Sequence, residues 1–326
     1  MELPELRRPI IIDQLEALLR RLPQQHPKRE EISDYLRRFH VGFSGEKSLA
    51  MQLSMMPDGV HVFRQIHLRS PIQNEKFQID LLLVTPFFLL VGEVKHIAGY
   101  LQFDTERGQL LRTWNGETNT FSCPLRQSER QAFHLRKWVE KRMQVSLPVL
   151  YHVLVSQDQA QIDAPKTESG IYHAVNLPSR VRKLMIEHSK RYISKEQLRK
   201  LCSDIEHANR ETGADLLHRF QLDRREVMGP IPCPSCGKEP LRRRKLSWGC
   251  FSCRYRSRTS HLQALHDIGL LIQEPLRRKD FELLFLGASD RSILRLLNPW
   301  TKREGYYYHI VREKTSAALG SLSSAL

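Results

Sequence analysis

Apolar and polar positions follow two different periods in the first half of the chain. Helical spacing, with an apolar residue every three or four positions, covers residues 15–22, 30–39 and 43–56. In the third stretch, Ser44 or Gly45 is expected near the N-cap. Strand-like runs then follow at residues 60–68, 77–84 and 87–95. Pro86 separates the second run from the third and predicts a tight turn there.

The pattern continues with a predicted hairpin and a helix–strand pair. Residues 99–104 and 109–114 are expected to extend the sheet as a hairpin about Glu106–Gly108. Residues 128–143 have the period of an amphipathic helix, and residues 147–156 that of a further strand. This order predicts an α/β fold: a restriction-endonuclease-like mixed sheet flanked by helices.

Later segments are shorter and more irregular. Residues 178–222 have a charged, helical pattern, and cysteines punctuate residues 233–253. Three short helices are expected near 260–272, 278–286 and 289–297, then a strand or wing at 305–311 and a frayed end from 316. The C-terminal segment is therefore predicted to be helical, and its element order also allows a winged-helix-like unit. Such a unit would either bind DNA or serve packing and dimerisation. The predicted boundaries are an N-terminal helical extension (1–40), a nuclease-like domain (41–165), a helical connector (166–227), a zinc ribbon (228–258) and the C-terminal segment (259–326).

Charge narrows the class of partner. The chain has 51 Lys and Arg against 36 Asp and Glu, a formal net charge of +15. Such a surplus favours nucleic acid or another polyanion, although a merely soluble basic surface accounts for it equally well. No apolar run reaches the roughly 18 residues of a membrane span, and the first residues do not have the pattern of a signal peptide. We expect a cytoplasmic protein without a membrane partner, in which clustered cysteines bind metal.

Three charged residues interrupt the apolar strands at 77–84 and 87–95. Glu93 and Lys95 lie two apart and so project from one face, while Val94 points to the other. If the two strands pair across the Pro86 turn, Asp80 lies close to Glu93. Two adjacent carboxylates repel each other, and a hard divalent cation such as Mg²⁺ or Mn²⁺ relieves that repulsion. The alternative is a strand-end ion pair of Glu93 and Lys95 beside Asp80.

A set of short motifs in a fixed order resembles the nuclease-related domain (NERD) family, a branch of the PD-(D/E)XK nuclease superfamily. The resemblance covers roughly residues 40–160. It rests on Gly42–Glu46, Gln78–Asp80, Glu93–Lys95, Gly99, Trp114 and Cys123–Gln127. The family usually has Asn-Pro where this chain has Cys123-Pro124, and Cys123 is expected to be a small buried apolar residue.

The resemblance implies roles for five residues. Asp80 would be the principal ligand of a catalytic Mg²⁺ or Mn²⁺ and Glu93 the second ligand. Lys95 would be the catalytic lysine, Glu46 the helix carboxylate that completes the metal site, and Gln127 a polar group beside it. The resemblance therefore implies that the chain would be a metal-dependent nuclease that hydrolyses phosphodiester bonds of DNA.

Cysteines in the second half have the spacing C-x2-C-x13-C-x2-C, formed by Cys233, Cys236, Cys250 and Cys253. Two such knuckles supply the four thiolates that a structural Zn²⁺ prefers, and the arrangement resembles a topoisomerase-type zinc ribbon. Disulfides are the alternative, which a reducing compartment disfavours.

The ribbon is rich in basic residues, with eleven Lys and Arg against three acidic residues over residues 219–258. The residues expected to bind nucleic acid are Arg242, Arg243, Arg244, Lys245 and Trp248. Trp248, with Phe251 and Tyr255, would stack on bases. A solvated basic loop with one core Trp is the alternative.

Three functions therefore compete. The first is an active nuclease, and the second is a catalytically inactive nucleic-acid-binding protein on a nuclease-like scaffold. The third is an adaptor that recruits a protein partner through its terminal helices. Cleavage, binding without turnover, and partner binding without nucleic acid would distinguish them.

Overall fold

The structure, a computed structural model, describes residues 6–72, 75–167 and 170–323. Its contacts divide the chain into two compact units. Unit 1 comprises residues 1–8 and 40–211, and unit 2 comprises residues 9–39 and 212–326. The N-terminal helices predicted as an extension thus pack in one unit with the segments predicted as zinc ribbon and C-terminal segment.

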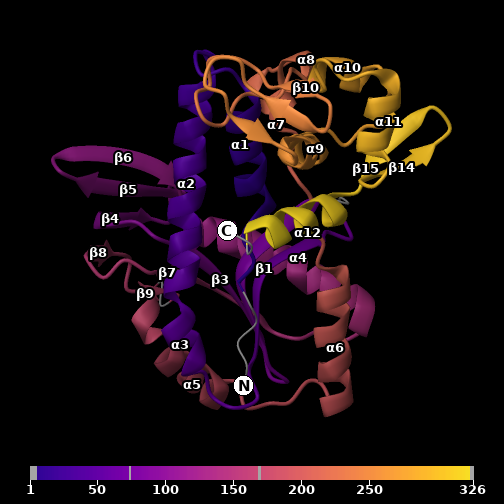
Figure 1. Cartoon of the computed structure of the whole chain (residues 1–326). Coiled ribbons are helices and arrows are strands. Elements are labelled where there is room, and N and C mark those ends of the chain that lie inside the picture. Colours follow the sequence, from indigo (N-terminus) through magenta and orange to yellow (C-terminus); the bar gives the residue numbers. More distant parts are fainter. Residues whose placement is uncertain (1–5, 73–74, 168–169, 324–326) are drawn as a thin grey trace. The chain divides into compact units, whose positions relative to one another are not determined.

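Unit 1 contains a five-stranded mixed sheet in the order β1-β2-β3-β7-β9 (Figure 1). Its strands are β1 (His61–Arg69), β2 (Lys76–Val84), β3 (Leu89–Lys95), β7 (Val149–Val155) and β9 (Ile171–His173). The first three strands are antiparallel, and β3, β7 and β9 are parallel. This confirms the mixed sheet and the predicted pairing of the Asp80 and Glu93 strands, which β2 and β3 make across the turn at Thr85–Phe88.

Helices cover both faces of this sheet. Leu135 and Trp138 of α4 (Pro124–Met143) pack with α6 (Lys195–Ala208) against one face. The other face is covered by α3 (Ala50–Ser54) and α5 (Leu177–Glu187), which follows the short 3-10 helix at Ala174–Asn176. In β3, Leu89 and Val91 face the α4 side and Leu90 the opposite side. The alternation places Glu93 and Lys95 on one face, as the sequence predicts, and this face is the one that α4 covers.

The predicted hairpin forms, but it does not extend the main sheet. Strands β4 (Gly99–Asp104) and β5 (Gln109–Trp114) pair antiparallel and join β6 (Glu117–Ser122) and β8 (Ala160–Asp163) in a second sheet, ordered β6-β5-β4-β8. The sequence pattern did not indicate β6, β8 or β9. Cys123 lies buried beneath this sheet with Leu101 and Phe103, which confirms it as a small core residue.

Helix α2 (Arg29–Ser48) runs continuously through the region predicted as the end of one helix and the start of another. Neither Ser44 nor Gly45 caps a helix. Gly45 is instead a packing residue, because a Cβ there would lie 2.3 Å from the Cβ of His96. The glycine therefore lets the last turn of α2 approach the end of β3 closely.

Unit 2 combines short helices with two small sheets (Figure 1). Its helices are α1 (Ile10–Arg21), the first part of α2, α7 (Leu216–Phe220), α8 (Arg224–Val227), α9 (Ser260–Leu271), α10 (Asp280–Leu284), α11 (Asp290–Leu297) and α12 (Arg312–Ser323). One sheet has the strands β10 (Arg242–Arg244), β11 (Ser247–Gly249) and β12 (Arg256–Ser257). The other has β13 (Leu276–Arg277), β14 (Thr301–Glu304) and β15 (Tyr307–Ile310).

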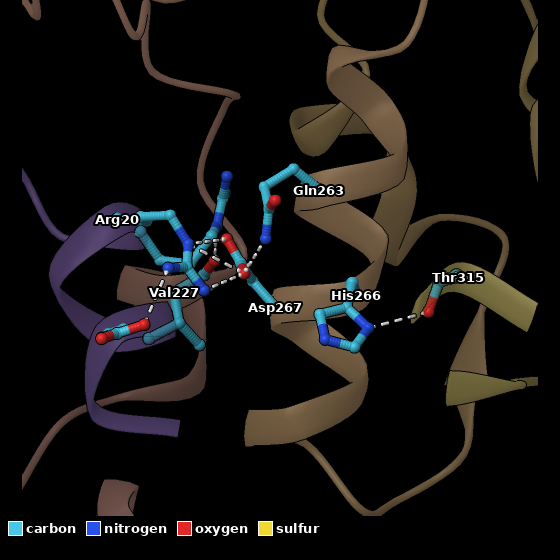
Figure 2. Close-up of polar contacts among 8 residues, drawn as sticks. Arg20, Val227, Gln263, His266, Asp267 and Thr315 are labelled. Atoms are coloured by element: carbon cyan, nitrogen blue, oxygen red, sulfur yellow. Dashed lines mark hydrogen bonds and ion pairs between the residues drawn. The ribbon is translucent and has the colours of Figure 1, made fainter. Parts of the chain in front are cut away.

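A single hydrophobic core holds unit 2 together. Leu18 of α1, Trp248 of the β10–β12 sheet and Ile268 of α9 belong to it. Polar contacts reinforce the α1–α9 packing: Figure 2 shows Arg20 against Asp267, which also accepts from Gln263 at 2.8 Å.

The C-terminal residues predicted to fray are helical as far as Ser323. The helix packs on α9, where buried Thr315 lies 3.0 Å from Nδ1 of His266 (Figure 2). Tertiary packing thus outweighs the weak local signal of a run of small residues. Residues 324–326 lie outside the described part of the chain.

Candidate metal centre and nucleic-acid interface

Asp80 and Glu93 lie on neighbouring antiparallel strands, one step beyond the pair formed by Leu81 and Gly92. Asp80 Oδ2 accepts a hydrogen bond from the backbone N–H of Val94 at 3.0 Å, which ties it to β3. Glu93 is buried, with 2% of its surface exposed. The two carboxylates and Lys95, which the sequence predicts as one site, therefore lie close enough together for the charges of Glu93 and Lys95 to act on Asp80.

Lys95 forms a close ion pair with Glu93. Its Nζ lies 2.6 Å from Glu93 Oε1, and its side chain keeps 29% exposure while that of Glu93 keeps 3%. This is the strand-end ion pair of the alternative interpretation. It neutralises one carboxylate but leaves two more acidic groups in the same neighbourhood.

Those two groups are strongly perturbed. Burial, followed by the neighbouring carboxylates of Glu93 and Glu46, raises the pKa of Asp80 well above its usual value. Burial raises the pKa of Glu46 to about 7, against the opposing charge of Arg64. The Glu46 carboxylate on α2 is thus close enough to Asp80 for the two charges to interact.

Two residues that the sequence did not single out position these carboxylates. Gln65 of β1 has a left-handed backbone, with φ of 52°, and its side chain donates to Glu46. It stands between the pairs that Arg64 and Ile66 make with β2, directly across from Asp80. Such a conformation costs a non-glycine residue roughly 1–2 kcal/mol and tends to cluster at functional sites.

The second is Gln131 of α4. Its Nε2 donates to Glu93 Oε2 at 3.0 Å, whereas Gln127, one turn earlier, bonds through its backbone N–H to Cys123. Among the described residues, the Gln127 side chain makes no hydrogen bond to the three carboxylates. The predicted glutamine is therefore on the correct helix, but Gln131 occupies the position beside Glu93.

The donor set fits a hard cation. Glu46 Oε2 and Gln131 Oε1 are buried oxygen atoms without a hydrogen-bond partner. Oxygen atoms of this kind, with Asp80 and Glu93, are the ligands that Mg²⁺ and Mn²⁺ take. In the described part of the chain the carboxylates do not gather within 4.8 Å as the four thiols do, so an ion would draw them closer.

The four ribbon cysteines form a compact cluster. Their Sγ atoms all lie within 4.8 Å of one another, with Cys233 3.6 Å from Cys253 and Cys236 3.7 Å from Cys250. With a Zn–S bond of roughly 2.3 Å, the edge of a tetrahedron is about 3.8 Å. The spacing fits zinc, and all six cysteines are free thiols, so the disulfide alternative is wrong.

The predicted nucleic-acid residues divide into two groups. Arg242, Arg244 and Lys245 are exposed on the β10–β11 hairpin. Arg243 and Trp248 are turned inward: Trp248 is fully buried, and the Arg243 guanidinium lies over its ring, 5.2 Å from the centroid. The prediction that Trp248 stacks on bases is wrong, because it packs against Phe285 and donates to His261 Nδ1 at 3.3 Å.

The exposed aromatic residue of the ribbon is Phe251, with 54% exposure. The guanidinium of Arg244 lies 4.1 Å from its ring centroid. Arg242 also lies near this ring, 6.0 Å from its centroid. Two exposed arginines around an exposed aromatic ring form a surface that can contact phosphates and bases together.

The model of the nuclease-related domain family matches residues 41–156. This range contains Glu46, Asp80, Glu93 and Lys95. Residues 41–156 are a nuclease-related domain. No curated protein matches the chain. None of the described helices has the length and apolar character needed to cross a membrane.

The family match covers residues 41–156 and gives no information on the rest of the chain. The zinc-compatible cysteine cluster and the helices of unit 2 are additions to it. Nucleic acid is the class of partner that a nuclease-related domain implies, and the basic ribbon agrees with that class.

Proposed function

We propose that the chain is a Mg²⁺- or Mn²⁺-dependent nuclease that hydrolyses phosphodiester bonds of DNA. The observation that carries the proposal is the proximity of Asp80, Glu93 and Lys95 at the adjoining parts of β2 and β3, with Glu46 and Gln131 beside them. A bound divalent cation would polarise the phosphate and lower the pKa of an attacking water.

The protein's own residues have separate tasks in this proposal. Asp80 and Glu93 would hold the cation, with the orphan oxygen of Glu46 completing the set. Gln131 would orient Glu93 through its amide N–H. Lys95 would exchange its contact with Glu93 for a phosphate oxygen, where its charge stabilises the pentacovalent arrangement.

The test is cleavage of plasmid and of linear single-stranded DNA by the purified chain, with Mg²⁺, Mn²⁺, Ca²⁺ or no added metal. Asp80→Ala and Lys95→Ala should each lower the rate by at least about 10³-fold, since each removes a group that acts on the transition state. Asp163→Ala is the matched control, because Asp163 pairs with Tyr100 on the second sheet, and it should cleave normally. Cleavage that survives both site substitutions would exclude this site.

The two glutamines provide a finer test. Gln131→Ala should weaken Mn²⁺ binding and lower the rate about 10- to 100-fold, as expected for loss of a group that orients a metal ligand. Gln127→Ala should change both by less than about threefold. A larger loss of rate and of Mn²⁺ binding in Gln127→Ala than in Gln131→Ala would show that Gln127 has the role that the family resemblance implies.

The inactive-scaffold function has one observation in its favour: the 2.6 Å ion pair already satisfies Lys95 and Glu93. Tight DNA binding without turnover in any metal would select it over the nuclease.

A further inference from the structure

The C-terminal part of unit 2 has the element order of a winged helix. Along the chain come α9, β13, α10, α11, β14 and β15, and the strands form a sheet in the order β13-β15-β14. Helices α10 and α11 are joined by a short turn in which Gly287 has a φ of +80°. Two helices joined by a glycine-containing turn are the arrangement that places a second helix in the major groove of DNA.

The second helix of this pair, α11, has one apolar and one basic side. Ile293, Leu296 and Leu297 are buried in the core of unit 2. Arg291 and Arg295 lie four positions apart and are exposed on one side of the helix. In the described part of the chain, neither arginine has an ion-pair or hydrogen-bond partner. Two such guanidinium groups are available to phosphate or guanine.

The β14–β15 hairpin provides the wing. Figure 1 shows the hairpin of β14 and β15. Glu304 pairs with Tyr307, so the tip consists of Gly305 and Tyr306. Tyr306 is 83% exposed, the highest among the large apolar residues that are exposed. Arg303, exposed on β14, donates to the backbone carbonyl of Gly305 at 2.8 Å and so holds its charge at the tip.

The zinc ribbon is docked on the turn between α10 and α11. Strand β10 donates from Arg243 N–H to the carbonyl of Leu286 at 2.8 Å. The contact is close, because a Cβ added to Gly287 would lie only 3.3 Å from the Arg243 carbonyl oxygen. Trp248 and Phe285 pack at 5.6 Å between ring centroids. The exposed Arg242 of the ribbon therefore adjoins the turn that leads into α11.

We propose that the ribbon hairpin, helix α11 and the wing form one composite surface that binds duplex DNA. Helix α11 would enter the major groove, roughly 12 Å wide, with the ribbon arginines and the wing on the flanking phosphates. The inference rests on the proposed function, in which the substrate is DNA, and adds that the DNA is bound as a duplex. A duplex fits better than a single strand, because Arg244 already lies over the ring of Phe251 and leaves less of it for base stacking.

The experiment measures binding of the full-length Asp80→Ala protein, with zinc bound and without added magnesium, to a labelled 20-base-pair duplex. Anisotropy is recorded between 50 and 200 mM KCl. Two double charge reversals test the surface: Arg291→Glu with Arg295→Glu, and Arg242→Glu with Arg244→Glu. The control, Arg37→Glu with Arg38→Glu on α2, makes the same change in net charge in the same unit.

Each surface pair should weaken binding about tenfold or more and reduce the slope of log K against log salt by about 2, since each phosphate contact contributes about 0.9. The control should lower affinity less than about threefold at 150 mM salt, where charges not in contact are screened. Zinc content and thermal unfolding confirm folding, and arginine-to-glutamine versions replace any reversal that fails to fold. The proposal is overturned if the surface variants bind the duplex with the same affinity and salt dependence as the control variant. It is also overturned if the protein binds a single strand more tightly than the duplex.

The outcome is separate from that of the nuclease proposal because binding is read without turnover. Loss of duplex binding in the surface variants supports the composite surface even if no metal gives cleavage. Unchanged duplex binding refutes it even if the wild-type chain cleaves DNA.

Discussion

The Arg20–Asp267 pair in unit 2 should be strongly asymmetric in its contribution to stability. Arg20 donates from Nη2 to Asp267 Oδ1 at 2.8 Å and from Nε at 3.1 Å, which joins α1 to α9 (Figure 2). The Arg20 side chain keeps 40% exposure but that of Asp267 only 2%. Deleting the arginine therefore leaves a buried charge, whereas deleting the aspartate leaves a cation that reaches water.

The magnitudes follow from that difference. Arg20→Ala leaves Asp267 with the Gln263 amide as its remaining side-chain donor, and breaking a buried pair in this way costs about 3–5 kcal/mol. Asp267→Ala should cost about 2 kcal/mol, the value of a hydrogen bond to a charged group.

Urea denaturation, followed by tryptophan fluorescence to which the buried Trp248 of unit 2 contributes, measures these differences. The double variant Arg20→Ala with Asp267→Ala should be more stable than Arg20→Ala alone, because it holds no unpaired buried charge. Arg37→Ala is the control: its ion pair with Asp34 is exposed, so the change should be below about 0.5 kcal/mol. Equal losses for the two single variants, or a double variant less stable than both, would refute the reasoning.

Three further outcomes are expected. Cys236→Ser should abolish stoichiometric zinc binding, measured by metal analysis, and make unit 2 sensitive to limited proteolysis, because a structural zinc contributes about 10–16 kcal/mol in small domains. Burial lowers the pKa of His152 to about 4, so the unfolded chain binds the His152 proton first as pH falls below 6.5. The stability that depends on His152 therefore falls by about 2 kcal/mol from pH 7 to pH 5, and urea titrations should show a loss smaller by that amount in His152→Gln. Gly45→Ala should destabilise unit 1 by about 1–3 kcal/mol through overpacking, whereas Gly42→Ala, with nothing within 4 Å of its added Cβ, should be neutral or up to about 1 kcal/mol stabilising in thermal unfolding.

The local part of the candidate site could be predicted from the sequence. Strand alternation places Glu93 and Lys95 on one face, and the short turn at Pro86 brings Asp80 beside them. Both follow from a period of two and a tight connection, which involve no distant contact. The same holds for the cysteines, because each knuckle is a local turn and the metal fixes the distance between knuckles.

The parts that the sequence did not predict depend on tertiary packing. Helical periodicity allows Gln127 or Gln131 to face the sheet, and the packing of α4 on β3 and β7 decides for Gln131. Nothing in the local sequence predicts the left-handed backbone of Gln65, since glutamine has no preference for it. Trp248 lies among arginines in the sequence, but its partner Phe285 is 37 positions away, so its burial is invisible locally.

The order of segments in unit 2 has a consequence for biosynthesis. Helix α1 leaves the ribosome before most of unit 1, but its partner on α9 follows 247 positions later, after unit 1 has been made. At about 5–20 residues per second, α1 waits roughly 12–50 s with its apolar side unprotected. The nascent chain therefore has time to fold the nuclease-related domain first, and the exposed helix is the segment on which a chaperone would act.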